Sequence, residues 1–377
     1  MLSLLLMVTA FAPPQSLSDV VVTTMRDRTE ARVAGAPQGA LVVLAIGLDP
    51  VASPLPGGAV LGFAPLAASP LAVVDARGVA GVRILHPGAP GGFDFLAQCV
   101  ALDPTVGLGR PGGLRVSPVH RQRVPELGDD AEVMLLFGQS NCEGWAPVAT
   151  LPHRLAGPQP MLRIWNLTAG EWQAVEAGVN TNMVAGAPFF GPEMGMVPRA
   201  AARANPLWIV KAAVSPSSLG PTPGPFNEWG ATAGELYPLM LARLDAAVSE
   251  LRRLGYRPRV RTCCMMQGES DAILPSLAAA YAANLGLLLT TLRADLAARQ
   301  LVGEGPPAIR VGLVSDRLGA AGFGHVAEVR AAQAAVVETL ELASTVETLD
   351  LSLAADGVHF DAAGLIELGV RLVADRR

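Results

Sequence analysis

The chain has 377 residues, of which 51% are hydrophobic and 16% are charged, with 40 glycines, 31 prolines and a formal net charge of −5. This length exceeds that of one ordinary domain, and the composition excludes a largely disordered chain. The cations are nearly all Arg, since Lys211 is the only lysine, and the absence of a basic block argues against nucleic acid as a partner.

The chain begins with a short apolar run over residues 1–12 that ends in Ala10-Phe11-Ala12. It resembles the apolar region and cleavage site of a secretory signal and is too short to span a bilayer. We therefore predict a signal peptide over residues 1–18 and a secreted or periplasmic protein. The usual Lys or Arg before the run is missing, so a strand packed on the first domain is the alternative. No later segment approaches eighteen uninterrupted apolar residues, which predicts no membrane partner after processing.

Residues 19–127 carry short β-rich segments separated by turns rich in Gly and Pro. These segments are 20–24, 31–34, 41–46, 60–63, 82–85 and 93–100. Their spacing predicts an all-β, sandwich-like accessory domain without a helix of ordinary length. The polar segment 125–130 is the predicted linker.

The pattern changes after Ala131 to alternating strand, loop and helix. Strands are predicted at 132–137, 207–214, 260–266, 309–314 and 344–349. Helices are predicted at 234–254, 277–300, 325–342 and 362–374, and a hairpin excursion joins 164–166 to 171–173. This alternation predicts that residues 128–377 form a three-layer α/β/α domain with a parallel sheet.

The cysteines are Cys99, Cys142, Cys263 and Cys264. Their spacing matches no metal site, so we predict no metal. No other cofactor is implied. Disulfides are permitted in an exported protein, but small buried hydrophobic residues are the favoured interpretation.

A candidate nucleophile, Ser140, follows the apolar run 133–136 in the sequence Phe137-Gly138-Gln139-Ser140-Asn141. The run is typical of a buried strand that is followed by a loop and a helix. Ser140 would then stand at the carboxyl edge of the sheet, where open α/β folds bind ligands, near the free N–H groups of a helix N-terminus. The alternative is an ordinary helix cap.

A second polar cluster, Gln267-Gly268-Glu269-Ser270-Asp271, follows the strand that contains the adjacent cysteines. In a parallel sheet this loop shares an edge with Ser140, so the Gln267 amide can donate to an oxyanion. The alternative is a buried glutamine that supports a turn. Glu269 and Asp271 either orient the site, bind substrate hydroxyls or are structural.

The third stretch, Asp356-Gly357-Val358-His359-Phe360, precedes the last helix, for which Asp361 is the predicted N-cap. The spacing lets the Asp356 carboxylate accept from Nδ1–H of His359, so that Nε2 faces a serine as its base. The alternative is a solvated turn.

Together, in this order, the three stretches resemble the SGNH hydrolase superfamily, and most closely its sialate O-acetylesterase-like branch, carbohydrate esterase family 6. The resemblance covers residues 132–377. Weaker matches are Gly191-Pro192-Glu193, Trp229, Arg330 and Gln333.

The resemblance implies an α/β/α fold with Ser140 as nucleophile, His359 as base and Asp356 as the residue that orients the base. It implies an oxyanion hole made by the Ser140 N–H, the Gln267 side chain and one further N–H. Gln139, Asn141, Glu269 and Asp271 are the substrate-binding or supporting residues.

The chain departs from the family where a Gly-Gly loop supplies that further donor. The matching position reads Ser215-Pro216-Ser217-Ser218. Pro216 has no N–H and biases its neighbour toward extended backbone, but Ser215 keeps its own N–H, and we expect that group to be the third donor. Cys142 stands where the family usually has Met.

We therefore expect a serine esterase that removes O-acetyl groups from carbohydrate through an acyl-enzyme, with an acetylated carbohydrate as its partner. One alternative is a carbohydrate-binding or envelope protein that keeps the fold but has lost activity. Another is an esterase that acts on lipid or other small esters.

Overall fold

The computed structural model describes residues 15–48, 50, 53–55, 60–63, 65–87, 89–106, 113–182, 188–222 and 227–374. The chain divides into two compact units, which are treated separately. The first comprises Met1–Asp129, Ala156–Met161 and Leu254–Tyr256, and the second comprises Asp130–Leu155, Leu162–Arg253 and Arg257–Arg377. The sequence does not predict that two later segments join the first unit.

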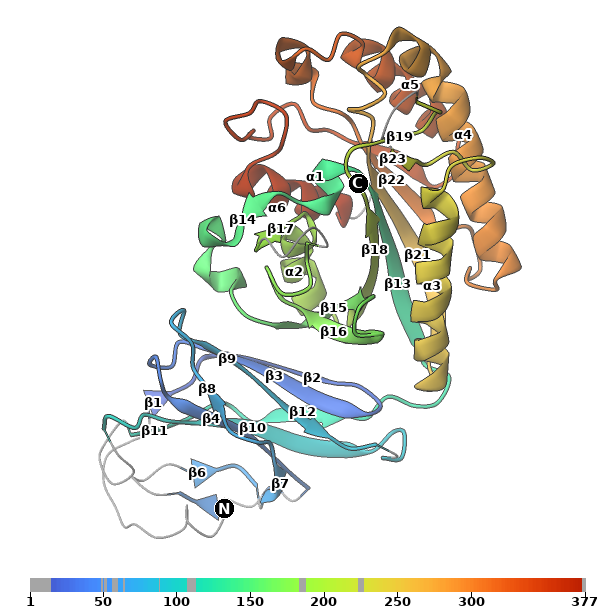
Figure 1. Ribbon diagram of the computed structural model, residues 1–377. Helices are drawn as coiled ribbons and strands as arrows, with labels where there is room; N and C mark the ends of the chain where they lie inside the picture. Colours follow the sequence, from blue (N-terminus) through green and yellow to red (C-terminus); the bar gives the residue numbers. More distant parts are fainter. Residues whose placement is uncertain are drawn as a thin grey trace. The chain divides into compact units, whose positions relative to one another are not determined.

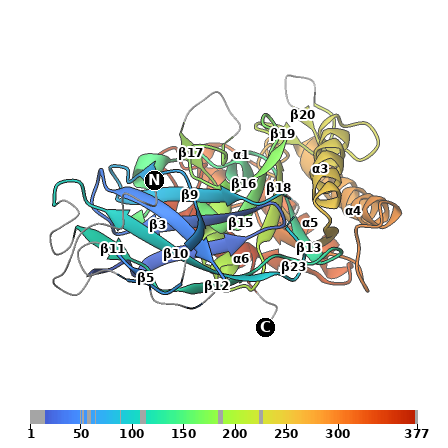
Figure 2. The same cartoon turned by 90° about the horizontal axis from the view of Figure 1, so that it is seen from below.

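Every element described between residues 15 and 129 is a strand (Figure 2). The strands are β1 (Gln15–Ser16), β2 (Asp19–Thr24), β3 (Arg28–Ala34), β4 (Leu41–Gly47), β5 (Ser53–Pro54), β6 (Val60–Leu61), β7 (Pro65–Ala68), β8 (Ala72–Val73), β9 (Val79–Leu85), β10 (Asp94–Leu102), β11 (Leu114–Val116) and β12 (His120–Arg123). One sheet follows the order β1-β11-β10-β4-β7, with β12 on β10 and β8 on β4, and a second follows β2-β3-β9.

A shared apolar cluster holds side chains from both of these sheets. Val33 on β3 and Val82 on β9 lie in one cluster with Leu44 on β4 and Cys99 on β10. Strand β9 alternates buried and exposed residues over most of its length, as expected where one face of a sheet covers a core.

The signal peptide is predicted over residues 1–18, and residues 1–14 of this segment lie outside the described residues. Its last residues are folded in the first unit. Strand β1 pairs with β11, and Leu17 is buried in the core. The signal peptide stays a prediction.

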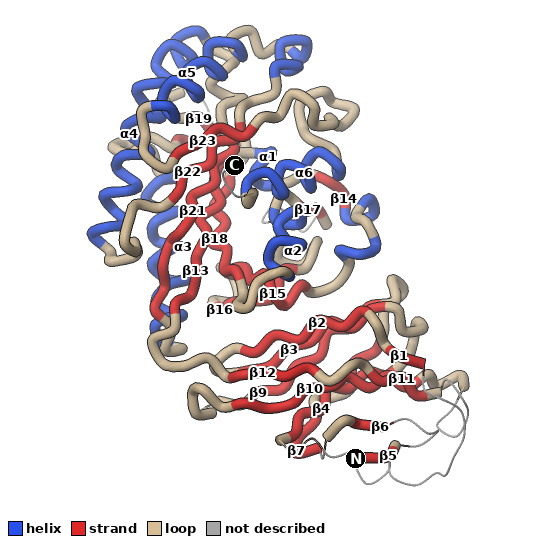
Figure 3. Tube along the Cα trace, turned by 180° about the vertical axis from the view of Figure 1, so that it is seen from behind, coloured by secondary structure: helices blue, strands red, loops and turns tan. Residues whose placement is uncertain are grey.

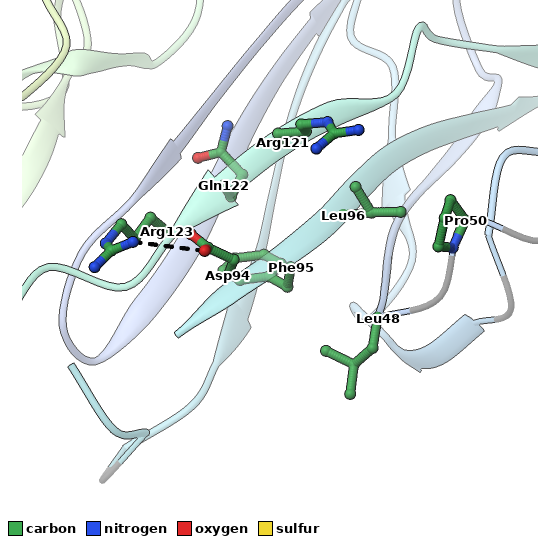
Figure 4. A pocket seen from close by; sticks show the side chains of 8 residues that line it. All are labelled: Leu48, Pro50, Asp94, Phe95, Leu96, Arg121, Gln122 and Arg123. Atoms are coloured by element: carbon green, nitrogen blue, oxygen red, sulfur yellow. Dashed lines mark hydrogen bonds and ion pairs between the residues drawn. The ribbon is translucent and has the colours of Figure 1, made fainter. Parts of the chain in front are cut away.

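The first unit has a hollow of about 430 Å³ on the sheet that contains β4, β10 and β12 (Figure 4). It is lined by Leu48, Pro50, Asp94, Phe95, Leu96, Arg121, Gln122 and Arg123. Arg123 lies 3.5 Å from Asp94 and 2.8 Å from Glu126, so local carboxylates already pair with this cation.

The second unit is built on a seven-stranded sheet in the order β16-β15-β18-β13-β21-β22-β23. Its strands, with short ones outside this sheet, are β13 (Asp130–Gly138), β14 (Ala146–Pro147), β15 (Gln159–Asn166), β16 (Glu171–Val175), β17 (Phe189–Phe190), β18 (Leu207–Ala213), β19 (Ser217–Ser218), β20 (Asn227–Glu228), β21 (Arg257–Met266), β22 (Ala308–Gly312) and β23 (Ala343–Val346). In this sheet the neighbouring strands β15, β18, β13, β21, β22 and β23 are all paired in parallel. Gly138 at the end of β13 lies opposite both Ala213 and Met266. The ends of three strands therefore meet beside the Ser140 turn.

Helices cover both faces of this sheet (Figures 1 and 3). They are α1 (Ser140–Glu143), α2 (Glu193–Ala201), α3 (Leu236–Arg253), α4 (Pro275–Ala298), α5 (Val326–Glu338) and α6 (Ala362–Leu372), with short 3-10 turns at Val148–Thr150, His153–Leu155 and Asp316–Ala321. Helices α3, α4 and α5 lie on one face, and α2 and α6 on the other. By length and composition α4 alone, among the described helices, could cross a membrane. It is nevertheless tied into this unit, because Tyr237 on α3 donates to Asp295 on α4 at 2.6 Å.

The predicted strands and long helices all occur, with changes at their ends. The hairpin expected at 164–166 and 171–173 is part of the main sheet, as β15 and β16. The predicted helix 325–342 is shorter in the structure and ends at Glu338, with Thr339 as its C-cap. Helix α2, which contains Pro198, was not predicted.

Candidate active site

The Ser140 turn begins where β13 ends. Gly138 has a φ of +146°, and a Cβ there would overlap the carbonyl oxygen of Met266. Only glycine therefore allows the turn to approach β21 this closely. Gln139 donates its N–H to Met266 O at 3.0 Å, and Ser140 opens α1. Among the described residues the Ser140 hydroxyl and N–H have no hydrogen-bond partner.

The predicted pair of Asp356 and His359 is present in the loop before α6. Nδ1 of His359 lies 2.7 Å from Oδ2 of Asp356, and the N–H groups of Val358 and His359 both donate to Oδ1 at 2.9 Å. Burial alone would raise the pKa of Asp356, but the His359 side chain and these N–H groups hold it below its usual value. A carboxylate in this state fixes the imidazole with Nε2 free. Asp361 caps α6 by accepting from Gly364 N–H at 2.9 Å, as the sequence predicts.

Asn141 links the Ser140 turn to the His359 loop. Its Oδ1 accepts from the N–H of Phe360 at 2.8 Å, and its Nδ2 donates to Val358 O at 3.3 Å. The same Nδ2 donates to Oε1 of Glu269 at 2.7 Å. Three segments that are far apart in the sequence therefore meet at one amide, and Asn141 and Glu269 are supporting residues.

Glu269 is a buried carboxyl, only 1% exposed. Burial raises its pKa, while Asn141 and His359 act in the opposite direction. Its Oε2 is buried without a hydrogen-bond partner. Asn141 is the side-chain donor to this carboxyl. A substitution that removes it would destabilise the fold, because a buried carboxylate oxygen without a hydrogen-bond partner is costly.

The prediction that the Gln267 side chain donates to an oxyanion is wrong for this structure. The side chain is 0% exposed, and Nε2 donates to Asp271 Oδ2 at 2.6 Å and to Ser217 O at 3.1 Å. Gln139 Oε1 lies 3.3 Å from the same Nε2. An amide nitrogen has two hydrogens, so none remains for a substrate oxygen. Gln267 instead supports the loop, the alternative that the sequence left open.

Asp271 completes this support. It accepts from the N–H of Leu219 at 3.0–3.1 Å, and Gln267 is its side-chain donor. Burial raises the pKa of Asp271 to about 6, although these hydrogen bonds lower it. Asp271 therefore fixes the segment that follows Ser215-Pro216.

Ser215 is half-buried, and its N–H donates to no described acceptor. The neighbouring Val214 N–H donates to Gly138 O at 3.0 Å, which holds this segment beside the Ser140 turn. That Ser215 is the third oxyanion donor stays a prediction.

Lys211, on β18, was not predicted as a site residue. Its ammonium donates to the carbonyls of Glu143 and Thr181, both at 2.6 Å, and to Oε2 of Glu193 at 2.8 Å. Lys211 and Glu193 are buried, and all three N–H donors are used, as a buried ion pair requires. This pair holds the end of α1. The signal available in the sequence was a lone lysine on an apolar strand.

Trp145 was also missed. Its ring is stacked on the His359 ring, with centroids 5.6 Å apart and an interplanar angle of 19°. Its Nε1–H donates to Oε2 of Glu143 at 3.1 Å. Burial raises the pKa of Glu143, against the effects of Trp145, Lys211 and His359. An aromatic residue a few positions after Ser140 was the only available signal.

All four cysteines are free and buried, so the interpretation as buried hydrophobic residues is confirmed. Burial raises the pKa of Cys142 well above its ordinary value, which makes it a poor nucleophile. The part of the chain that the structure describes contains no group of His, Cys, Asp and Glu residues that could hold a metal ion.

Comparison with known proteins identifies the family of the second unit. Residues 130–376 match the family "Carbohydrate esterase, sialic acid-specific acetylesterase". No curated protein matches the chain. A crystal structure of a protein from Arabidopsis thaliana is similar, with 19% identity, a TM-score of 0.51, and coverage of 64% of this chain and 95% of that one.

Two other solved structures are less similar in fold. NanS has 16% identity, a TM-score of 0.47, and coverage of 65% of this chain and 95% of its own. A family two carbohydrate esterase from Cellvibrio japonicus has 10% identity, a TM-score of 0.36, and coverage of 94% and 89%. Since the family match spans more than half of the 377 residues, the chain belongs to the sialic acid-specific acetylesterase family of carbohydrate esterases and is a carboxylic ester hydrolase.

Proposed function

We propose that this protein removes O-acetyl groups from carbohydrate through an acyl-enzyme on Ser140. The observation that carries the proposal is the Asn141 link, which brings the His359 and Asp356 pair to the Ser140 turn. A serine hydroxyl without a partner, on a turn bound to the loop of an imidazole that a carboxylate orients, is suited to nucleophilic catalysis.

In the first half-reaction, Nε2 of His359 takes the proton of Ser140 as Oγ bonds to the ester carbonyl carbon. The C–O bond to the sugar then breaks, and the same proton passes from Nε2 to the leaving sugar oxygen. In the second half-reaction, water gives its proton to Nε2 and attacks the acetyl carbon, and Ser140 recovers its proton as acetate leaves. Asp356 keeps the imidazole oriented throughout.

The charge on the tetrahedral oxygen needs preorganised donors. We assign the N–H groups of Ser140 and Ser215 to this role, because neither has an acceptor among the described residues. Gln267 acts indirectly, by fixing the loops around them.

We further propose that the protein is exported and that its first unit is an accessory β-sandwich. The apolar run at residues 1–12 supports export, and the core between the two sheets supports the sandwich. Protease protection of the protein in fractionated cells tests export.

The test of the proposed function is acetate release from a panel of acetylated glycans by the full chain. Ser140→Ala should lose turnover while keeping its thermal midpoint, because only one hydroxyl is removed. Ser315→Ala is the matched control, since this buried hydroxyl also lacks a partner. If Ser140→Ala retains more than a few per cent of wild-type turnover, Ser140 is not the nucleophile.

A second candidate is a carbohydrate-binding protein with impaired catalysis. It is favoured by the occupied Gln267 amide and by Ser215-Pro216 in place of two glycines. Loss of one oxyanion donor costs about 2.7 to 4 kcal/mol of transition-state stabilisation. The double variant Ser215→Gly/Pro216→Gly should change turnover only a few-fold if Ser215 already donates. A gain of about a hundredfold or more would show that it does not.

A further inference from the structure

Trp145 differs from every other tryptophan of the chain. The five tryptophans all lie in described parts of the structure, and Trp165, Trp172, Trp208 and Trp229 are at most 8% exposed, whereas Trp145 is 37% exposed. Tryptophan is enriched at interfaces, because its ring buries a large apolar area while its N–H can find a hydrogen-bond partner.

The exposed indole is held in one orientation from several sides. Nε1–H donates to the buried carboxyl of Glu143, and the ring is stacked on His359. The Phe189 ring lies 5.9 Å away at 34°. The short antiparallel pairing of β14 with β17 aligns Ala146 with Phe190 and Pro147 with Phe189, next to Trp145 in the chain. The indole is therefore preorganised before any ligand arrives.

The proposed reaction brings the leaving alcohol of the ester close to this surface. Because Nδ1 of His359 is bound to Asp356, only Nε2 can return the proton to the leaving alcohol. That alcohol oxygen must come within about 3 Å of Nε2. The indole centroid is only 5.6 Å from the imidazole centroid, so the indole lies beside the group that would protonate the leaving alcohol.

We propose that Trp145, held by Glu143 and flanked by Phe189, forms the wall of the subsite for the alcohol part of the ester, and that it selects esters of pyranoses. This inference rests on the proposed esterase function and adds its specificity. The C–H groups on one face of a pyranose ring provide a flat apolar area that matches an indole face, while the hydroxyl groups at the ring edge stay in water. A small alkyl alcohol lacks this area.

The experiment compares two esters that share the acetyl group, ethyl acetate and a mono-acetylated methyl pyranoside. In Trp145→Leu, kcat/KM for the pyranoside should fall about tenfold or more relative to ethyl acetate, and Trp145→Phe should keep much of the preference. Leu239→Ala, at an exposed leucine on α3, is the control for a general loss of apolar surface. Equal losses for both esters, or no loss for either, would overturn the proposal.

Glu143 is a positioning residue in this scheme. Glu143→Gln keeps an acceptor for the indole N–H and should retain the preference for the pyranoside, whereas Glu143→Leu should lose it as Trp145→Leu does. If Glu143→Gln and Glu143→Leu behave alike, the indole is not held through this hydrogen bond, and that part of the proposal fails.

A binding measurement separates this proposal from the proposed function. If the wild-type chain hydrolyses neither ester, the esterase proposal fails, and the subsite is then judged by titrating the acetylated pyranoside into Ser140→Ala and into Ser140→Ala/Trp145→Leu. Binding that is at least about tenfold weaker in the double variant supports the subsite. Equal binding, or none in either variant, overturns it.

Discussion

Two histidines of this protein make nearly the same local pair, and one of them, His359, lies in the candidate active site. His359 contacts Asp356 and His325 contacts Glu328, each at 2.7 Å and three residues apart, and both histidine side chains are 27% exposed. The loop of His359 is bound to the Ser140 turn by Asn141, and its ring is stacked on Trp145. His325 precedes α5, and its N–H donates to Ala272 O. The comparison teaches that a histidine–carboxylate pair can form in different local settings, and it supports our proposal that attachment to the Ser140 turn gives the His359 pair its catalytic role.

The largest expected effect separates the two histidines themselves. His359→Ala should lower kcat for acetate release about 10⁴- to 10⁶-fold, because it removes the general base. His325→Ala should stay within about twofold of the wild type. Steady-state kinetics on an aryl acetate measures both. A similar loss of kcat in the two variants would contradict the assignment of His359 alone as the base.

Substitutions of the two carboxylates, Asp356 and Glu328, should also differ in their effect on kcat, by a smaller factor than those of the histidines. Asp356→Asn should lower kcat about 10³- to 10⁴-fold, since an amide cannot hold the imidazole in the required tautomer. Glu328→Gln serves as the matched control and should remain near wild-type activity. Loss of activity in Glu328→Gln would place the second pair in the mechanism.

The hydrogen bonds of Asn141 that join the Ser140 turn to the His359 loop can be removed without changing either histidine–carboxylate pair. Asn141→Leu removes the bonds to Phe360, Val358 and Glu269, and it should lower kcat about a hundredfold and cost about 2 to 4 kcal/mol of unfolding free energy, because Glu269 stays buried without its partner. Adding Glu269→Leu should restore part of the stability but not the activity, since the His359 loop stays untethered. Chemical denaturation and kinetics together test this. Full activity in Asn141→Leu would show that the link is dispensable.

The smallest effect is a shift in the pH profile. Only a neutral imidazole accepts the serine proton, so activity should rise with pH and be lost as acid protonates the histidine. The lowered pKa of Asp356 keeps its carboxylate charged through that range, where it stabilises the cation. In Asp356→Asn the midpoint of the acid limb should therefore move to lower pH, by about one unit or less. Glu328→Gln should leave the midpoint unchanged, and a shift there instead would contradict the assignment.

The sequence predicts the central strands well because their signal is local. The run 132–137 corresponds to β13, Asp130–Gly138, and its apolar side chains are buried. The edge of the sheet is harder to predict. Strands β15 and β16 follow the same local rules as an isolated hairpin, and only the parallel pairing of β15 with β18, which aligns residues 162–164 with residues 207–209, joins them to the sheet.

Within the site, the sequence by itself determined which residues carry reactive groups: a serine after a strand, and a histidine three residues after an aspartate. These features depend on covalent spacing and on short-range backbone geometry. The tertiary structure alone decided what each polar group contacts. It assigned the Gln267 amide to Asp271 and Ser217, joined Asn141 to Phe360 across more than two hundred residues, and placed Trp145 on His359. A side chain has few hydrogen-bonding groups, and which partners they take depends on distances between segments that residue order does not specify.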